Sequence, residues 1–355
     1  MEDMTWLKDI KEPNRSFIIQ HVFMECSKRL EQEVYEAEET LGTAMIVRFL
    51  SEMGTIIGCG YYVLYWILSW ERIKAKKKHR IVMFDGQTSY SFVAYLMGLT
   101  KEENVLIDCA EDLLFSPNRD KPPYMTLVVP VGCRPDSPNL ISWRESQWLT
   151  ELEKAFAKNG EELDEEDYDQ CMEQIYDWRN AYDFYKNKPW EEKKFAAYKS
   201  AVECYIRSLG EDADPELSKE LLENADSPLW ERLVNGSREP FLNLISMIRG
   251  TGVYRANGGT KCSGKSGIFS WDDVFYYMEE QSGGDREIAF QAAESVRKGK
   301  GADEDVQKML KEHGAEEEFC AICAGIKYLV NEGSCLLIMR QICAFARWTG
   351  KLTEE

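Results

Sequence analysis

The longest apolar run in the chain limits its possible folds more than any other feature. It extends over 15 residues from Ile56 to Trp70, contains two glycines and is bounded by Glu52 and Glu71. A helix that spans a bilayer needs about 20 apolar residues. We therefore predict that this segment is a core helix of a folded domain, and we expect no membrane partner.

The charge balance excludes one class of nucleic-acid-binding protein. The 355 residues include 62 Asp and Glu against 43 Lys and Arg, which gives a formal net charge of −19. Proteins that wrap duplex DNA obtain most of their non-specific affinity by neutralising phosphates, so an acidic chain does not fit that class. Eleven Cys without paired spacing, and Glu2, Asp3 and Asp9 where a secretory signal is basic, predict a cytoplasmic protein with free thiols.

Three short β-rich runs separated by turn residues predict one small sheet in a helical protein. The runs are Ile81–Phe84, Asn104–Asp108 and Met125–Val131, whereas Ser16–Gly42 and the chain from Trp143 onward are expected to be helical. The predicted fold class is α+β, predominantly helical with one small mixed β-sheet. We expect three domains: a domain with the sheet at 1–150, an acidic helical insertion at 151–239 and a helical domain at 240–355.

Capping residues and glycines predict the helix boundaries after Pro240. Ser270 is expected to cap a helix that starts at Trp271 and ends at the Gly283–Gly284 pair. The helices expected to follow are Asp285–Lys298, Ala302–His313, Glu316–Val330 and Ser334–Trp348.

Four segments match, in part, patterns that carry chemistry. Gly259–Ser266 has the phosphate-loop spacing G-x-x-x-x-G-K-S, but no hydrophobic strand precedes it, so we expect a surface loop. Cys320 and Cys323 lack the second ligand pair of a zinc site, which predicts buried thiols. The acidic run Glu161–Asp169 lacks the donor spacing of an EF-hand and predicts a solvated helix start. The basic Lys74–Arg80 stretch predicts a solvated helix end, with a phosphate patch as the alternative.

Two ordered blocks, at about 45–100 and 240–350, share motifs with one known family. The shared segments are Arg48–Ile57, Ser91–Thr100, Gly250–Tyr254, Trp271–Val274, Ser295–Gly301 (S-V-R-K-G-K-G) and Ile326–Tyr328 (I-K-Y). The first two resemble the palm of PolC-type bacterial DNA polymerase III alpha subunits, and the others resemble the fingers. The resemblance implies a palm-like residue range 1–150 and a fingers-like range 240–355.

The chain departs from this family where the family handles nucleotides and metal ions. The nucleotide loop G-S-R-G-S-V-G-S of the family corresponds to Met83–Tyr90, where Asp85 occupies the arginine position. In the second block, Glu332 replaces a lysine of the family. The carboxylates of its D-I-D-x-D-F motif, which two-metal phosphoryl transfer requires, have no counterpart. The candidates Asp212 and Asp214 lie in a helical or turn context.

These departures predict a catalytically inactive relative, a pseudoenzyme, that acts as a binding or scaffold protein. We expect no catalytic residue, no metal site and no cofactor. One alternative is an active DNA-directed DNA polymerase, which would require Mg²⁺; another is an acidic DNA mimic that inhibits a nucleic-acid enzyme. A protein partner from the replication machinery is expected, and nucleic-acid binding stays open. The remnants of nucleotide or DNA contacts that the resemblance implies are Gly86, Ser89, Ser91, Arg297, Lys298, Lys300 and Lys327.

Overall fold

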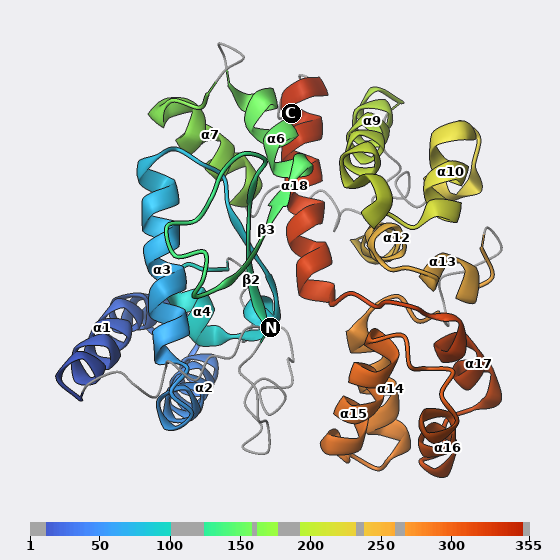
Figure 1. Ribbon diagram of the computed structural model, residues 1–355, viewed down its shortest axis with the longest axis horizontal. Helices are drawn as coiled ribbons and strands as arrows, with labels where there is room; N and C mark the ends of the chain where they lie inside the picture. Colours follow the sequence, from blue (N-terminus) through green and yellow to red (C-terminus); the bar gives the residue numbers. More distant parts are fainter. Residues whose placement is uncertain are drawn as a thin grey trace. The chain divides into compact units, whose positions relative to one another are not determined.

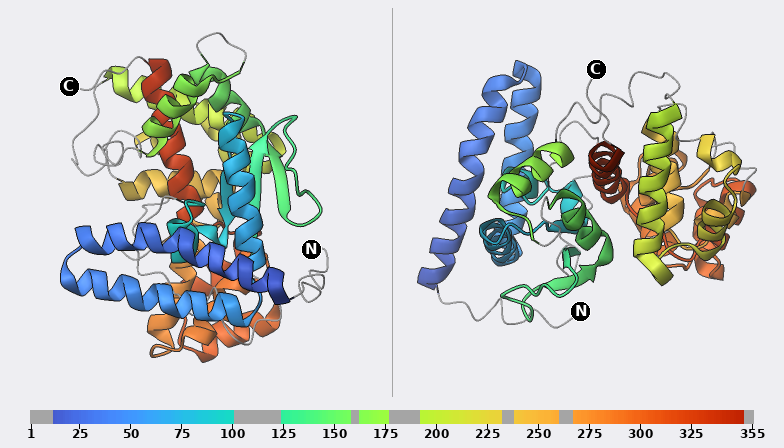
Figure 2. Two further views of the ribbon diagram at one scale, coloured as in Figure 1. Left: turned by 90° about the vertical axis from the view of Figure 1, so that its left-hand side faces the viewer. Right: turned by 90° about the horizontal axis from the view of Figure 1, so that it is seen from above.

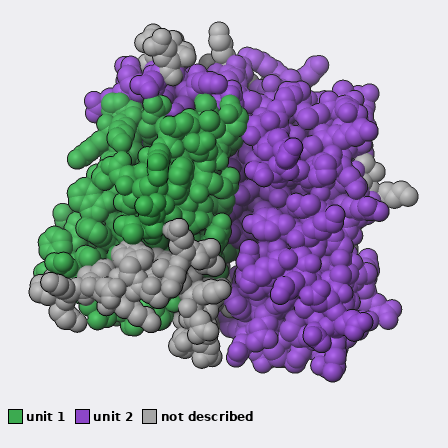
Figure 3. Space-filling model, viewed as in Figure 1, with its two compact units in different colours: residues 1–150 green, residues 151–355 purple. Residues whose placement is uncertain are grey.

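The computed structural model is mostly helical and contains one small three-stranded mixed sheet, which confirms the predicted α+β class (Figure 1). It describes residues 12–100, 124–157, 162–176, 192–231, 238–259 and 267–350. The chain divides into two compact units, unit 1 with residues 1–150 and unit 2 with residues 151–355 (Figure 3). The division into three domains stays a prediction.

Unit 1 combines the sheet with long helices. Its helices are α1 (Glu12–Glu36), α2 (Glu39–Gly58), α3 (Tyr62–Lys77) and α4 (Phe92–Leu96), with a short 3-10 helix η2 (Gln87–Tyr90) before α4. Its strands are β1 (Met83–Gly86), β2 (Met125–Pro130) and β3 (Ser142–Ser146). The unit boundary falls within α6 (Gln147–Phe156).

The sheet has the order β1-β2-β3, with the fully buried β2 in the centre. Strand β1 is antiparallel to β2, with Met83 opposite Val128, and β3 is parallel to β2, with Thr126 opposite Ser142. The expectation that the chain is helical from Trp143 was wrong, because β3 occupies 142–146 and the helix begins at Gln147. As a polar edge strand, β3 lacks the apolar alternation that marks a strand in sequence. The predicted run Asn104–Asp108 lies outside the described residues.

Two of the expected helix boundaries in unit 1 were wrong. Ser16–Gly42 is not one helix, because α1 ends at Glu36 and α2 begins at Glu39 and returns antiparallel to α1 (Figure 2). Gly42 makes this return close, since a Cβ added there would lie 3.3 Å from the Val34 side chain. The apolar run Ile56–Trp70 is also divided, by a turn between α2 and α3 at which Gly60 has a φ of 78°.

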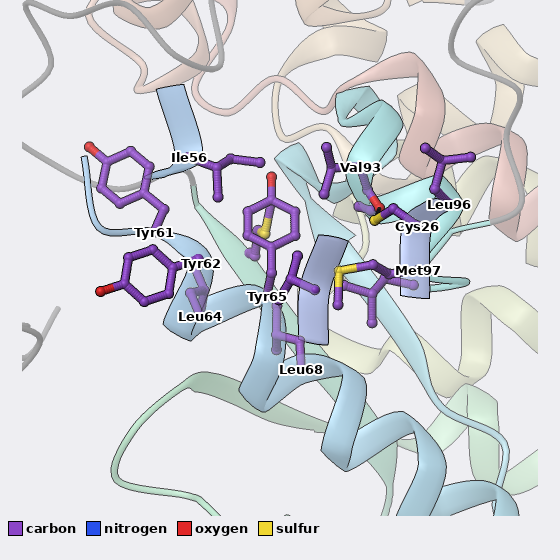
Figure 4. Close-up of a cluster of buried hydrophobic side chains, with 14 of the residues drawn as sticks. Cys26, Ile56, Tyr61, Tyr62, Leu64, Tyr65, Leu68, Val93, Leu96 and Met97 are labelled. Carbon is purple, nitrogen blue, oxygen red and sulfur yellow. Dashed lines mark hydrogen bonds between the residues drawn. The ribbon is translucent and has the colours of Figure 1, made fainter. Parts of the chain in front are cut away.

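The apolar run nevertheless supplies much of the core of unit 1, as predicted. Figure 4 shows Ile56 from α2 and Tyr65 and Leu68 from α3 gathered with Cys26 from α1 and Val93 from α4. All five side chains are fully buried. Within the described residues, the helix with the length and apolarity of a membrane span is α2, a test that core helices of soluble proteins also pass.

The described part of unit 2 consists of helices and their connections and contains no strand, apart from one isolated bridge. Its α-helices are α7 (Glu165–Tyr176), α9 (Glu192–Leu209), α10 (Pro215–Glu223), α12 (Arg238–Arg249), α13 (Val253–Ala256), α14 (Trp271–Gln281), α15 (Arg286–Arg297), α16 (Glu304–Glu312), α17 (Glu317–Gly325) and α18 (Glu332–Gly350). The 3-10 helices are η3 (Gly210–Asp212) and η4 (Pro228–Trp230). The mostly buried α18 packs against α7, α9 and α12.

The predicted caps in unit 2 are confirmed. Ser270 and Asp273 form a reciprocal capping box at the start of α14, and Gly283 and Gly284 follow its end with positive φ. One boundary was wrong, because α17 ends at Gly325 and not at Val330. Residues 326–330 leave the helix because tertiary partners take their backbone groups: Trp271 N donates to Val330 O at 2.7 Å.

Candidate functional site

Three segments that resemble the polymerase fingers in sequence meet in unit 2. We call Gly250–Tyr254, Ser295–Gly301 and Ile326–Tyr328 together the basic platform. The N–H groups of Lys327 and Tyr328 both donate to Thr251 O, at 2.9 and 3.1 Å. Leu329, which directly follows the last segment, donates its N–H to Arg297 O at 3.3 Å, so residues 327–329 are bonded to both of the other segments.

Glycines allow the backbones of the basic platform to lie close to one another and to the end of α17. Gly299 has a φ of 73°, and a Cβ added there would overlap with Lys327 O. At Gly301 an added Cβ would overlap with Cys323 O, and at Gly252 it would lie 2.7 Å from Gly325 O. Backbone packing therefore explains the glycines of the S-V-R-K-G-K-G segment. It does not explain the lysines.

The lysines of the basic platform are exposed. Lys298 Nζ lies 3.0 Å from Glu294 Oε2, whereas Lys300 and Lys327 have no acidic partner among the residues that the structure describes. The stem of Lys327 lies beside Gly252, since its Cγ would be 3.5 Å from a Cβ added there. Two cationic groups thus face solvent on a backbone that is fixed by three converging segments.

Glu294 holds Arg297 at the edge of the basic platform through two bonds. Arg297 Nε donates to Oε1 at 2.8 Å and Nη2 donates to Oε2 at 2.9 Å. Burial alone would raise the pKa of Glu294, but the bonds and charges of Arg297 and Lys298 outweigh burial and lower the pKa to about 2. Glu294 is therefore ionised at neutral pH and offsets one of these positive charges.

Further groups border the basic platform. Tyr328 is 43% exposed and adds an aromatic ring to the cations. The Arg255 guanidinium on α13 is mostly exposed and lies 3.5 Å from Glu216 Oε1. Asp303, at the acidic start of α16, donates its N–H to Lys300 O at 3.0 Å, so acidic side chains limit the platform on that side.

The segment Met83–Tyr90, for which the sequence resemblance predicted a degenerate nucleotide loop, lies in unit 1. Asp85 Oδ2 accepts a bond from Arg144 Nη2 on β3 at 3.0 Å, and Asp85 Oδ1 accepts from Gly86 N at 2.8 Å. Gly86 has a φ of 83°, and a Cβ added there would press against Tyr124 O. The carboxylate of Asp85 is thus bonded within its own sheet.

The two predicted serine contacts of unit 1 are buried. Ser91 caps α4 by accepting from Ala94 N at 3.0 Å, and its hydroxyl also lies 2.9 Å from the Tyr65 hydroxyl. Ser89 Oγ donates to Gly86 O at 3.3 Å. Both hydroxyls therefore bond within the protein, and the three predicted residues of this loop form part of its framework.

The buried Glu52 connects this loop to α2. It accepts from Phe92 N at 2.8 Å, Val93 N at 3.0 Å and Ser91 Oγ at 3.0 Å, and from Arg48 Nε at 3.1 Å. Burial raises the pKa of Glu52, while Arg48 and the two N–H donors act in the opposite direction. Its carboxylate completes the N-terminus of α4.

The acidic residues considered for metal binding do not fit a metal ion. Asp214 Oδ1 accepts from Glu216 N and Leu217 N at 3.1 and 3.0 Å, and Oδ2 accepts from Gly252 N at 3.0 Å. This is the geometry of a helix N-cap, with both oxygens occupied by N–H donors. Across the described ranges, no group of three or more His, Cys, Asp or Glu side chains could hold a metal ion.

The remaining motifs have structural roles where the structure describes them. Cys320 and Cys323 are buried thiols of α17, as predicted, and burial raises the pKa of both. The basic stretch ends α3, and Lys74 and Lys78 lie 2.8 and 3.5 Å from the carboxylate of Asp136. The acidic run contributes the start of α7 at Glu165. Residues 158–161 and all of the phosphate-loop pattern after Gly259, residues 260–266, lie outside the described residues.

Sequence reasoning missed two groups that shape the basic platform. Glu294 precedes Arg297 by three positions and Lys298 by four, a helical spacing at which acids and bases pair, so this signal was present. The acceptor role of Thr251 O had no signal in the sequence.

In the comparisons with known proteins, no family model matches the chain and no curated protein matches it significantly.

Proposed function

We propose that this protein is a non-catalytic relative of PolC-type polymerase alpha subunits that acts by binding, and that its basic platform binds the phosphates of a nucleic acid. The observation that carries the proposal is the meeting of three family-like segments around Lys300 and Lys327, two exposed cations without acidic partners among the described residues. In a chain with a net charge of −19, a surface site with two exposed lysines of this kind is unusual.

The chemistry of the basic platform favours a single-stranded nucleic acid. Cations supply backbone affinity by releasing counterions, and an exposed aromatic ring such as that of Tyr328 can stack on a base. With two or three lysine–phosphate contacts, log K should fall with log salt at a slope of about −1.4 to −2.1. The acidic remainder of the protein would keep such binding weak and local.

The non-catalytic part of the proposal rests on the departures from the family. Asp85 stands at the position of the nucleotide-loop arginine, and the candidate carboxylate Asp214 is a helix cap. Primer extension by the full chain with magnesium or manganese tests this part. We expect no template-dependent product, and a template-dependent product would establish the active polymerase instead.

Fluorescence anisotropy with a labelled single-stranded oligonucleotide tests the binding part. The double variant Lys300→Ala/Lys327→Ala should weaken binding at low salt by about tenfold or more and reduce the salt slope by about 1.4. The matched control is Lys76→Ala/Lys77→Ala, which removes two exposed lysines at the end of α3. Wild-type protein that fails to bind at low salt, or a control that loses as much affinity, would refute the assignment.

A further inference from the structure

We propose that the outer face of α2 is the surface through which two copies of this protein pair. This inference concerns unit 1 and does not depend on the proposed function. Beyond its first turn, α2 carries only two charged residues, Arg48 and Glu52, and both are buried and paired with each other at 3.1 Å. Its exposed positions from residue 43 onward are Thr43, Ala44, Ile46, Val47, Leu50, Ser51, Gly54 and Gly58.

The distribution of charge on α2 is the reverse of that on an ordinary surface helix. In an amphipathic helix the charged side chains face water and the apolar ones face the core. Ile46, Val47 and Leu50 recur at the spacing of one helix face, and they are between 41% and 62% exposed. At Gly54 and Gly58, an added Cβ would meet nothing within 4 Å, so the face stays open toward the end of the helix.

The neighbouring α1 also carries exposed apolar side chains. Phe17, Phe23 and Met24 are between 44% and 63% exposed, and the Phe23 ring lies 5.5 Å from that of Phe49 on α2. Figure 2 shows α1 and α2 as an antiparallel pair at one side of unit 1. Single exposed apolar residues need no explanation, but six large ones on two adjacent helices indicate an interface.

The exposed area suits a second copy of the chain. Each of the six side chains leaves about 100 Å² exposed, which gives about 600 Å² per copy and about 1,200 Å² for a pair. Specific protein interfaces begin at about this total area. Because a twofold interface brings the same patch of both subunits together, the uncharged outer face of α2 can pair with itself without like-charge contacts.

The salt dependence of binding distinguishes a second copy of the chain from other possible occupants of the α2 face. Two copies of a chain with a net charge of −19 repel one another, and α2 offers them a face without charge. Added salt screens this repulsion and should therefore strengthen the pairing. A basic protein partner held by the acidic surface would show the opposite salt dependence.

Sedimentation of the full chain over a range of concentrations tests the pairing. Wild-type protein should show a monomer–dimer equilibrium that shifts toward the dimer as salt rises. Val47→Glu places a carboxylate on each side of the interface and should weaken the dimer by about 30-fold or more. The matched control is Val131→Glu, the same change at a valine that is 48% exposed in the turn after β2.

Two further measurements complete the test. Val47→Ser removes apolar contact without adding charge, and it should weaken the dimer by about threefold to tenfold even if the glutamate variant fails to fold. A wild-type chain that stays monomeric at every concentration would overturn the proposal. Equal effects of the two glutamate variants would also overturn it. So would co-sedimentation of the wild-type protein with neutral phosphatidylcholine vesicles, if Val47→Glu abolishes that co-sedimentation.

Discussion

Two regions of the molecule use an acid–arginine pair in opposite ways. In unit 1, Glu52 is fully buried with Arg48, and its remaining bonds go to the start of α4. In unit 2, Glu294 holds Arg297 at the margin of exposed lysines. Burial raises the pKa of Glu52, whereas the bonds and charges of its neighbours bring the pKa of Glu294 to about 2 despite burial. The charged residues before α4 in unit 1 are thus part of the internal framework, while the basic platform of unit 2 keeps charge at its surface.

The largest effect is expected from Glu52→Ala. This change leaves Arg48 without its buried partner and removes the acceptor of Phe92 N and Val93 N. Breaking a buried pair in this way costs about 3–5 kcal/mol of unfolding free energy, which urea denaturation would measure. The exposed Glu31 of α1 provides the control, since Glu31→Ala should change stability by less than about 0.5 kcal/mol. A loss below about 1 kcal/mol in the Glu52 variant would mean that this pair does not hold the framework.

A smaller, pH-dependent effect is expected from Glu294→Gln. A folded-state pKa of about 2 against the ordinary 4.5 corresponds to about 3 kcal/mol, which we reduce to about 2 kcal/mol because Lys298 is largely exposed. Since the folded-state pKa is depressed, this stability is present above about pH 4.5 and is lost as the pH falls toward 2. The difference between wild type and variant should therefore close over that window in urea titrations. A pH-independent difference would assign the effect to packing.

The Glu52 pair should respond to pH with the opposite sign. Because burial raises the folded-state pKa of Glu52, the folded protein binds a proton at this carboxyl more readily than the unfolded chain does. Its contribution to stability is greatest below the unfolded-state pKa and declines as the pH rises through the folded-state value. The two regions are thus distinguishable by the direction of their pH dependence alone.

The sequence predicted what depends on local chemistry. The cap at Ser270 and the glycines after α14 follow from short-range bonding, and the core position of Tyr65 follows from an apolar run. Prediction from the sequence failed where partners that are distant in the chain determine the local structure. Strand β3 exists because β2 pairs with it, and α17 ends early because Thr251 O accepts from Lys327 and Tyr328.

The candidate site shows the same difference between what the sequence predicts and what the packed chain determines. The resemblance indicated Lys300 and Lys327, and the structure places them on exposed turns of one platform. It indicated Ser91 equally, yet that hydroxyl is buried as a helix cap. Sequence identity in a motif does not distinguish a surface contact from a framework bond, because burial is a property of the packed chain.

The smallest effect on stability is expected from Asp85→Asn. Asp85 Oδ2 pairs with Arg144, whose side chain is 41% exposed, so screening limits the loss of stability to about 0.5–1 kcal/mol. Arg144→Gln should cost as much, and the double variant no more than either, because both changes remove one pair. If the loop is framework, Asp85→Asn leaves oligonucleotide affinity unchanged in the anisotropy measurement. If the loop still faces phosphates, removing this negative charge raises the affinity by about twofold to fivefold, and the distinction between the two regions fails.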